Sequence, residues 1–272
     1  MEVSLRGISA YAWAAPDWSA MRKLIRDAQA QPPSTASATT ENVAKPEKYQ
    51  PASLPRNERR RATEITRLSF RVIEALTENI DVDITQLNAV FASAGGDYDV
   101  VHKISTALAS TDDKISPTDF HNSVHNAPAG YWSIASQCHG TSTSLSAGDQ
   151  TFAHGLLEAV MLTESQAQDT LLVAYDTVPP MPLRRARPIA MPFAVALLLA
   201  KEPKPDDIAR LSLAMQSQAS SAQMPEDSAL IQQLAQGNPI GRSMPLLRAL
   251  ATQQEHAVLD DVQVSLGYSH DH

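Results

Sequence analysis

Apolar side chains recur at helical spacing in several stretches of the chain, which predicts amphipathic helices. The clearest helix is predicted over residues 63–80, because the apolar residues there fall on one stripe with a period of 3.6. The stripe consists of Ile65, Leu68, Val72, Ile73, Leu76 and Ile80. Helices are also expected over residues 17–27, with Asp17 as the N-cap, over residues 99–108 and over residues 152–163.

Other stretches follow patterns that are typical of β-strands. Residues 2–8 alternate polar and apolar side chains, which suits a short strand. Residues 87–93 form a short apolar run that ends before Gly95 and Gly96, the pattern of a buried strand leaving a sheet. The apolar runs 170–175 and 192–199 are bounded by Pro and acidic residues, which predicts central strands. Strands that alternate with amphipathic helices indicate an α/β fold whose sheet is covered on both faces.

Two regions lack this alternation. Residues 28–53 consist largely of Gln, Pro, Ser, Thr and Ala, so we expect a long surface loop that is partly mobile. After Pro203 the chain is rich in Gln, Ala and Ser, which predicts helices followed by a terminal strand at residues 263–266. The sequence shows no internal repeat of fixed period.

Composition excludes several classes of protein. Of the 272 residues 43% are hydrophobic and 19% are charged, and the net charge is −8. This balance argues against a nucleic-acid-binding protein, which needs a basic face. The longest apolar run, Phe193–Ala200, falls short of the roughly 18 residues of a membrane helix. The first residues lack a signal-peptide pattern and the single Cys138 fits a reducing compartment, so we expect a cytoplasmic protein.

Cys138 is the first candidate for chemistry, as a thiolate nucleophile with a lowered pKa. Its neighbour His139 offers little support, since adjacent side chains rarely point at each other, and a structural cysteine is the favoured interpretation. The C-terminal His270 and His272 suggest at most a weak metal site. The other histidines lack zinc-site spacing and no GxGxxG or P-loop motif occurs, so we expect no metal and no cofactor.

The basic run RNERRR, Arg56–Arg61, is a candidate docking surface for a carrier protein or another acidic partner. Its four arginines are Arg56, Arg59, Arg60 and Arg61. Most runs of this kind are solvated helix starts. Here the run precedes the helix predicted from residue 63, where positive charge opposes the helix dipole. That placement slightly favours a partner, and both interpretations stay open.

The stretch SAGDQTFAHGLLEA, residues 146–159, predicts a strand, a turn and a helix. Its small residues expose whatever follows at the start of the helix, which is where an acyl-transfer enzyme benefits from the helix dipole. Asp149 and Gln150 occupy this tip. Asp149 also has a structural role open to it, because its carboxylate can cap the helix amides. The residues alone leave an active site and a simple helix start undecided.

Residues 116–150, SPTDFHNSVHNAPAGYWSIASQCHGTSTSLSAGDQ, resemble the segment that leads into the active-site elbow of β-ketoacyl synthases. The matching residues are Ser116, Pro117, Asn126, Ala129, Gly130, Ile134, Gly140 and Ser142. LPRNERRRATEITRLSFRVIEAL resembles the early arginine-led helix of that family, and FASAGG resembles the strand after it. The resemblance covers residues 1–200, and none is visible after residue 203.

The departures from the family concern its catalytic groups. Asp149 stands at the nucleophile position, or Gln150 if the alignment shifts by one residue, and neither forms a thioester. Chain length factors of type II polyketide synthases are similar, because they carry an Asp-Gln pair where their partner has its Cys. Catalytic members also use two histidines from a second half to polarise the malonyl thioester. The tail of this chain offers His256, His270 and His272, in no matching motif.

The chain is similar to the short β-ketoacyl-synthase-like proteins of aryl polyene gene clusters, which carry the SVHNA stretch found here at residues 123–127. The resemblance implies a thiolase-like αβαβα layered fold. It places a ketosynthase N-terminal-like domain at residues 1–202 and a reduced helical C-terminal part of the same domain at residues 203–272. It further implies a non-catalytic chain length factor without activity of its own.

This subunit would form a heterodimer with a catalytic ketosynthase and meet the acyl carrier protein through that partner. The resemblance puts six residues at the acyl tunnel or the subunit interface: Phe120, Ser123, His125, Asn126, Tyr131 and Trp132. Phe120 is the first choice for the tunnel end, since an aromatic ring is bulky and rigid. The alternative for the large side chains is ordinary core. The alternative function is a stand-alone acyltransferase or hydrolase that uses Cys138 or Asp149.

Overall fold

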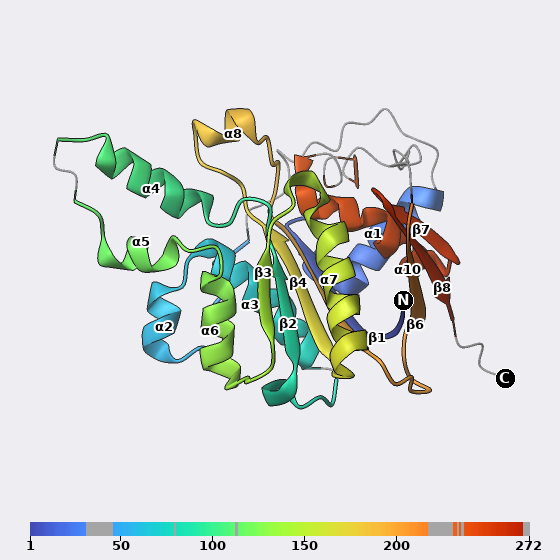
Figure 1. Cartoon of the computed structure of the whole chain (residues 1–272). Helices are drawn as coiled ribbons and strands as arrows, with labels where there is room; N and C mark the ends of the chain where they lie inside the picture. Colours follow the sequence, from blue (N-terminus) through green and yellow to red (C-terminus); the bar gives the residue numbers. More distant parts are fainter. Residues whose placement is uncertain are drawn as a thin grey trace.

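Eight strands form one mixed sheet in the order β3-β2-β4-β5-β1-β6-β8-β7 (Figure 1). The computed structural model describes residues 1–30, 46–78, 80–111, 114–216, 231–232, 234 and 237–268. β2 pairs in parallel with β3 and β4, and the other neighbouring strands are antiparallel. The strands are β1 (Glu2–Ala12), β2 (Asn88–Ala92), β3 (Ser142–Leu145), β4 (Thr170–Asp176), β5 (Phe193–Ala200), β6 (Ala209–Met215), β7 (His256–Leu259) and β8 (Val262–Gly267).

Helices cover both faces of this sheet, because successive strand residues point to opposite sides. Val90 and Leu172 belong to a core cluster with residues of α1, α7 and α10. Phe91 and Val173 belong to a second cluster with residues of α3 and α6. The predicted α/β fold with a doubly covered sheet is therefore confirmed. The helices are α1 (Trp18–Ala30), α2 (Arg56–Arg61), α3 (Glu64–Thr77), α4 (Tyr98–Leu108), α5 (Pro117–Asn122), α6 (Ala127–Ser136), α7 (Thr151–Gln166), α8 (Leu183–Ala186) and α10 (Met244–Thr252).

The hydrophobic pattern located the elements around the core correctly. β1, β2, β4 and β5 coincide with four predicted strands, and α1, α3, α4 and α7 coincide with the predicted helices. Asp17 caps α1 as expected, since its carboxylate accepts the Ala20 N–H at 2.8 Å. β4 and β5 lie side by side within the sheet, which confirms that both are central strands.

The expectation of helices after Pro203 is wrong for residues 209–215, which form β6. Side chains of β6 alternate between buried and exposed at its start, which is the pattern of a strand rather than a helix. β6 pairs with β1 and with β8, so residues on both sides of position 202 share one sheet. The terminal strand is confirmed as β8, and α10 supplies part of the expected helix.

The stretch 28–53 is not one continuous loop. Residues 28–30 end α1, and residues 31–45 lie outside the described residues. The last part, residues 46–53, is fastened to α3 through the carboxylate of Glu74. That carboxylate accepts the backbone N–H groups of Ala52 and Ser53 at 3.1 and 2.8 Å, and the hydroxyl of Tyr49. This end of the predicted loop is therefore fixed against a core helix.

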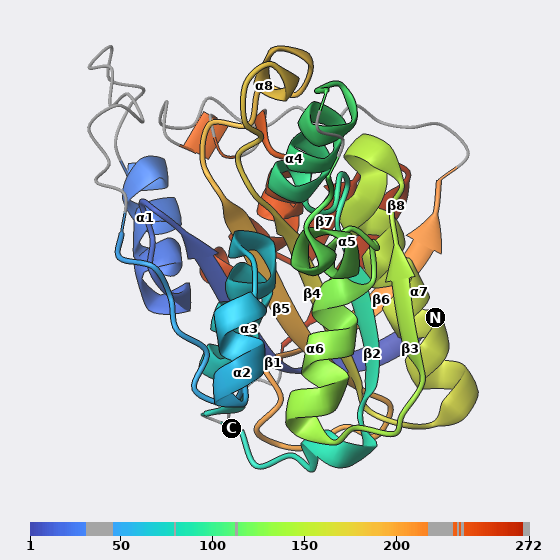
Figure 2. The same cartoon turned by 90° about the vertical axis from the view of Figure 1, so that its left-hand side faces the viewer.

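Two segments extend from the layered body at the edge of the sheet formed by the C-terminal ends of β2, β3 and β4. α4 and α5 pack together as an arm that reaches outward past α6 and β3 (Figure 1). α8 stands above the same edge, between β4 and β5 in the chain (Figures 1 and 2). Among the described residues no helix is long and apolar enough to cross a lipid bilayer.

Candidate functional site

The elbow predicted from the stretch around Asp149 is built by β3, the 3-10 turn Gly148–Gln150 and α7. Gly148 has a φ of +59°, a left-handed conformation that favours glycine. The hydroxyl of Thr151 donates to the Gly148 carbonyl at 2.6 Å and accepts the Ala147 N–H at 3.0 Å. Thr151 is fully buried, and its side chain therefore fixes the shape of the turn.

Asp149 does not cap α7, so the structural role expected for its carboxylate is wrong. Gln150 is the N-cap residue, and no side-chain hydrogen bond caps the helix there. The Asp149 carboxylate instead bonds the guanidinium of Arg187, 38 residues further along the chain. Arg187 offers a full positive charge and charge-assisted hydrogen bonds, which outweigh the partial charge of free helix amides.

Arg187 joins three loops at this edge of the sheet. It follows α8 in the segment between β4 and β5. Its guanidinium bonds Asp149 at the elbow and lies close enough to the hydroxyl of Tyr98, at the start of α4, for the two groups to interact electrostatically. Burial, and next the charge of Asp176, raise the pKa of Tyr98, so this phenol stays protonated near neutral pH. The elbow tip therefore carries an ion-paired carboxylate, Asp149, beside an amide, Gln150.

Asp176, the last residue of β4, is buried beneath these loops. Its carboxylate accepts the Ser93 hydroxyl at 2.8 Å and the Ala94 N–H at 3.2 Å. Burial raises the pKa of this carboxyl group to about 6. The hydroxyl of Ser146 donates to the Ala94 carbonyl at 2.9 Å, which ties the elbow to the loop after β2. The polar groups around the elbow thus form one connected scaffold.

Cys138 lies beyond the opposite end of β3 from the elbow. Its side chain is buried, and its thiol donates to the Leu87 carbonyl at 3.0 Å. Burial raises the pKa of this thiol, whereas an activated nucleophile needs a lowered pKa. His139, its neighbour in sequence, is exposed. These observations identify Cys138 as a structural residue.

The structure separates the three large side chains expected at the acyl tunnel. Tyr131 and Trp132 are buried in the core beneath α6, where the Trp132 ring lies 6.0 Å from that of Phe91. Phe120 on α5 is 68% exposed, so the core interpretation is wrong for this residue. It lies on the arm formed by α4 and α5, together with the exposed Leu108. The assignment of these rings to a tunnel stays a prediction.

The other three predicted residues lie where α5 leads into α6. The Ser123 hydroxyl donates to the Phe120 carbonyl at 2.8 Å and so belongs to the end of α5. Nε2 of His125 lies 2.9 Å from the Ser93 carbonyl oxygen, which connects this segment to the scaffold around Asp176. Asn126 is exposed at the start of α6. His125 and Asn126 open onto a groove that sequence reasoning missed.

This groove, of about 500 Å³, lies between α6 and β3, the edge strand of the sheet. The carbonyl groups of Thr141 and Leu145 point toward β2, because they accept the backbone N–H groups of Ala89 and Ser93. Backbone groups alternate along a strand, so the N–H and C=O of Ser142 and Ser144 point away from β2. A Cβ placed on Gly130 of α6 would meet no atom within 4 Å. The groove is lined by His125, Asn126, Ala129, Gly130, Ser133, Ser142 and Ser144.

The basic run precedes α3 as expected but forms a helix of its own, α2, so the expected conflict with the dipole of α3 does not arise. Arg59, Arg60 and Arg61 lie in the last turn of α2, where positive charge suits the helix dipole. Arg59 donates to the Leu54 carbonyl at 2.8 Å and thereby holds the preceding loop. Arg56, Arg60 and Arg61 are exposed, and docking through them stays a prediction.

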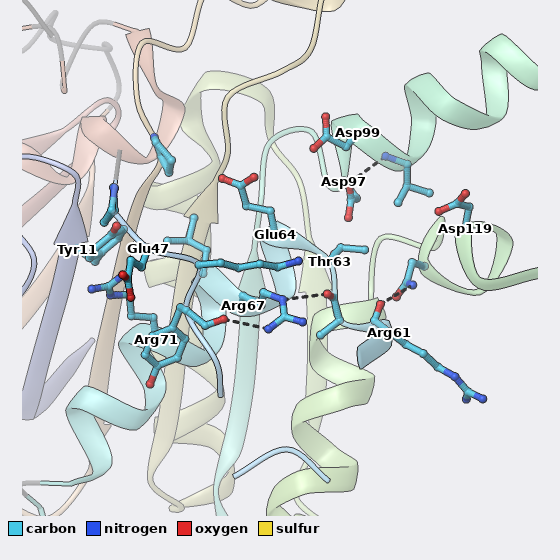
Figure 3. Close-up of a pocket in the computed structure, with 18 of the residues that line it drawn as sticks. Tyr11, Glu47, Arg61, Thr63, Glu64, Arg67, Arg71, Asp97, Asp99 and Asp119 are labelled. Carbon is cyan, nitrogen blue, oxygen red and sulfur yellow. Dashed lines mark hydrogen bonds between the residues drawn. The ribbon is translucent and has the colours of Figure 1, made fainter. Parts of the chain in front are cut away.

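A second cavity, of about 420 Å³, lies where α3 and α4 begin (Figure 3). Figure 3 shows Glu64, Asp97 and Asp99 on one side of it and Arg71 beside Tyr11 on the other. The Arg71 guanidinium lies 3.9 Å from the centre of the Tyr11 ring. Asp97 caps α4 by accepting the backbone N–H of Val100 at 3.0 Å. Side chains of both charges line the cavity, which selects no single class of ligand.

No group of three or more His, Cys, Asp and Glu side chains is arranged for a metal ion within the described ranges. His270 and His272, the weak metal candidates of the sequence, lie outside those ranges. His154, on α7, lies 3.9 Å from Asp261, and this contact joins α7 to the β7–β8 turn.

Comparison with known proteins places the chain in a family. The model of the β-ketoacyl synthase N-terminal domain matches residues 30–256. No curated protein sequence matches the chain. Among solved structures, a chain from the ketosynthase ApeO in complex with its chain length factor ApeC, from Xenorhabdus doucetiae, is 23% identical with a TM-score of 0.71. The alignment covers 98% of this chain and 99% of that chain.

Two further structures are similar over the same shares of both chains. A chain from the ishigamide ketosynthase/chain length factor has a TM-score of 0.70 at 13% identity. A chain from AntDE:AntF, a type II polyketide synthase acyl carrier protein in complex with its ketosynthase bound to the hexaketide, has 0.69 at 10% identity. These likenesses confirm the thiolase-like ketosynthase fold.

The family match ends at residue 256 and not near residue 203, so the expected limit of the resemblance is wrong. β6 explains the difference, because it continues the sheet of the N-terminal half past that position. Since the family model covers most of its length, the chain belongs to the β-ketoacyl synthase N-terminal domain family.

Proposed function

We propose that the chain is a non-catalytic chain length factor that pairs with a catalytic β-ketoacyl synthase in type II polyketide biosynthesis of the aryl polyene kind. The observation that carries this proposal is the elbow of a ketosynthase fold whose tip holds Asp149 bound to Arg187. A carboxylate held by a guanidinium is a weak nucleophile, and Gln150 beside it is an amide. Elongation chemistry then resides in the partner, and this chain shapes the space for the product.

The similar structures support pairing as the mode of action. Two of them are named as a ketosynthase with its chain length factor, and the third as a ketosynthase with an acyl carrier protein. We carry this arrangement over to the present chain: a heterodimer with a ketosynthase, visited by a carrier protein that bears the acyl chain. The proposed assembly needs no metal or cofactor in this subunit, and we place it in the cytoplasm.

The groove between α6 and β3 is the proposed surface for the ketosynthase. Ser142 and Ser144 present backbone N–H and C=O groups at the edge of the sheet, and these groups can pair with a strand of the partner. Gly130 leaves open space on the facing side of α6. Ile134, one turn further along α6, is 58% exposed and adds apolar surface. An open strand edge beside an exposed apolar side chain is suited to a protein interface.

The arm formed by α4 and α5 is the proposed tunnel element. It extends past α6 and β3, the two elements that line the groove (Figure 1). Phe120 on α5 is 68% exposed and Val124, just after α5, is 54% exposed, which is unfavourable for a chain in isolation. A partner seated in the groove would lie beside this arm, so both side chains would become buried at the junction of the subunits. Phe120 is then in place to limit the length of an acyl chain.

Reconstitution with a ketosynthase tests the proposal. The chain is co-expressed with candidate ketosynthases, and elongation of malonyl units on a carrier protein is followed by mass spectrometry of the released chains. We expect products from the pair, none from this chain alone, and none when the catalytic Cys of the partner is replaced by Ala. Expressed alone, the chain is expected to self-associate through its open strand edge. A covalent acyl adduct on the isolated chain, or a monomer that pairs with no ketosynthase, would contradict the proposal.

A further inference from the structure

We infer that the arginine-bearing turn at residues 183–187, named here the α8 turn, is the docking surface for the carrier protein, and that Asp149 holds this turn in place. The inference rests on the proposed function and adds to it the surface that the acidic partner contacts. It also assigns a role to Asp149, at the proposed nucleophile position, which is to anchor this docking surface.

Exposure and charge identify the α8 turn as a surface for an acidic protein. Arg184 and Arg185 lie in α8, and both are exposed at the tip of the segment. Arg187, at the base of the turn, is ion-paired with Asp149, so the free positive charge of the turn is that of its two tip arginines. The chain as a whole carries a net charge of −8. A local excess of positive charge on an acidic protein orients an acidic partner toward that one place.

The α8 turn is held at its base and free at its tip. Arg187 is fastened to Asp149 and lies near the Tyr98 hydroxyl. Two residues later the chain returns to the core, where Ile189 and Met191 are buried. The side-chain amide of Asn238 donates to the Met191 carbonyl at 3.2 Å and fixes that return. The contacts of Arg187 leave Arg184 and Arg185 directed to solvent on a supported base, which lowers the entropy cost of binding.

The position of the α8 turn distinguishes it from the other basic surface of the chain. α8 stands above the edge of the sheet at which the elbow lies, whereas α2 lies beside α6 at a lower level in Figure 1. The α2 run also contains Glu58, and its Arg59 is engaged in holding the loop before it. The side chains of Arg184 and Arg185 make no hydrogen bond or ion pair with the part of the chain that the structure describes. Their charge is therefore available to a partner.

Direct binding to the reconstituted pair tests this inference. Affinity is measured by fluorescence anisotropy with a labelled holo acyl carrier protein of the type II polyketide class, at several salt concentrations. The variant R184E/R185E is expected to weaken binding by about tenfold and to flatten its salt dependence. The variant R56E/R60E on α2 makes the same change in net charge and is expected to alter the affinity by less than about twofold.

Asp149→Ala tests the anchoring role, because it leaves both tip arginines in place. We expect carrier binding to weaken about two- to fivefold, with faster amide hydrogen exchange in residues 183–187. Asp149→Glu keeps the ion pair and is expected to restore both readings. If Asp149→Ala loosens the turn and leaves the affinity unchanged, the anchoring part of the inference is wrong.

Gel filtration separates a failure of this inference from a failure of the proposed function. Each variant is first shown to pair with the ketosynthase as the wild type does. Unchanged carrier affinity in a paired R184E/R185E variant, or equal losses in the α8 and α2 variants, would overturn the docking assignment and leave the chain length factor role standing. A wild-type chain that forms no pair would overturn both.

Discussion

The carboxylate of Asp149 at the tip of the elbow is bonded to the guanidinium of Arg187 from the loop after α8. This contact fits neither of the roles that the sequence left open for Asp149. Asp149 neither caps α7 nor stands free as a reactive group. The turn itself is held by Thr151, whose buried hydroxyl bonds the Gly148 carbonyl and the Ala147 N–H. The shape of the elbow therefore depends on Thr151, and the pairing of its charge depends on Asp149 and Arg187.

This division predicts different costs for two neighbouring substitutions. Asp149→Ala removes a partly exposed ion pair, so the free energy of unfolding should fall by no more than about 1 kcal/mol. Thr151→Val keeps the volume and removes two buried hydrogen bonds, which should cost about 1–3 kcal/mol. Urea denaturation of both variants measures the difference. A larger loss in Asp149→Ala than in Thr151→Val would show that the carboxylate, and not the hydroxyl, holds the turn.

The buried Asp176 predicts a specific pH dependence of stability. Its pKa is raised by burial to about 6, above the value near 3.8 of an unfolded Asp. Between these two values the folded state binds more protons than the unfolded state, so this group makes the protein less stable as pH rises from about 4 to 6. The size of the effect is on the order of 3 kcal/mol. Above about pH 7, one unit beyond the folded pKa, the contribution of Asp176 no longer changes.

Asp176→Asn tests this dependence, because the amide oxygen can still accept the Ser93 hydroxyl. The free energy of unfolding of the wild type minus that of Asp176→Asn should decrease between about pH 4 and about pH 7 and stay constant above. Asp149→Asn, at an exposed carboxylate of the same site, is the control and should show no comparable decrease. A difference that is flat over this range would mean that Asp176 titrates at its ordinary pKa.

Cys138 should behave as a buried structural thiol. Its raised pKa and its hydrogen bond to the Leu87 carbonyl predict alkylation by iodoacetamide that is at least about tenfold slower in the folded than in the unfolded chain. Cys138→Ala should leave product formation by the reconstituted pair unchanged, with a modest loss of stability. Rapid labelling of the native chain, or a folded Cys138→Ala pair without activity, would restore the alternative in which this thiol reacts.

Local periodicity was sufficient to locate the core. The helical stripe from Ile65 to Leu76 and the apolar run of β5 both appear where the pattern placed them, because burial acts on consecutive residues of one element. Compositional bias was less reliable. The bias toward Gln, Ala and Ser after Pro203 predicted helices, whereas the alternation within ARLSLAM, residues 209–215, marks the strand β6.

The errors at the site come from contacts between residues that are distant in sequence. The partner of Asp149 is 38 residues away, so a capping role was the natural expectation from its immediate neighbours. The edge position of β3 depends on the order of strands, which no single segment encodes. Phe120 and Trp132 are both aromatic and twelve residues apart, yet one is exposed on an arm and the other is core. Sequence pattern does not separate them because exposure depends on how α5 and α6 pack.

The open edge of β3 predicts opposite outcomes for proline at two adjacent positions. The N–H of Ser144 points away from β2, so Ser144→Pro should fold and lose its pairing with the ketosynthase. The N–H of Thr143 points toward β2, so Thr143→Pro should break the sheet and lower the free energy of unfolding by about 1 kcal/mol or more. Gel filtration with the partner and thermal denaturation alone provide the two readings. A Ser144→Pro variant that still pairs would remove the strand edge from the interface.

Phe120 and Trp132 form a matched pair for the acyl tunnel. Because Phe120 is 68% exposed, Phe120→Ala should change the free energy of unfolding of the isolated chain by no more than about 0.5 kcal/mol. Trp132→Ala removes a buried ring that packs on Phe91 and should cost about 3–5 kcal/mol. The test of function is the distribution of product lengths from the reconstituted pair.

If Phe120 closes the tunnel at the junction of the subunits, the Phe120→Ala pair should release longer chains than the wild type at an unchanged melting temperature. Leu108→Ala, at a similarly exposed position of the same arm (61% exposed), serves as the control for a general loss of apolar surface and should leave the product length as it is. Products of wild-type length from a stable Phe120→Ala pair would remove Phe120 as the limiting residue. Loss of pairing would instead make it an interface anchor, which still places its exposed ring against the partner and not in the core of this chain.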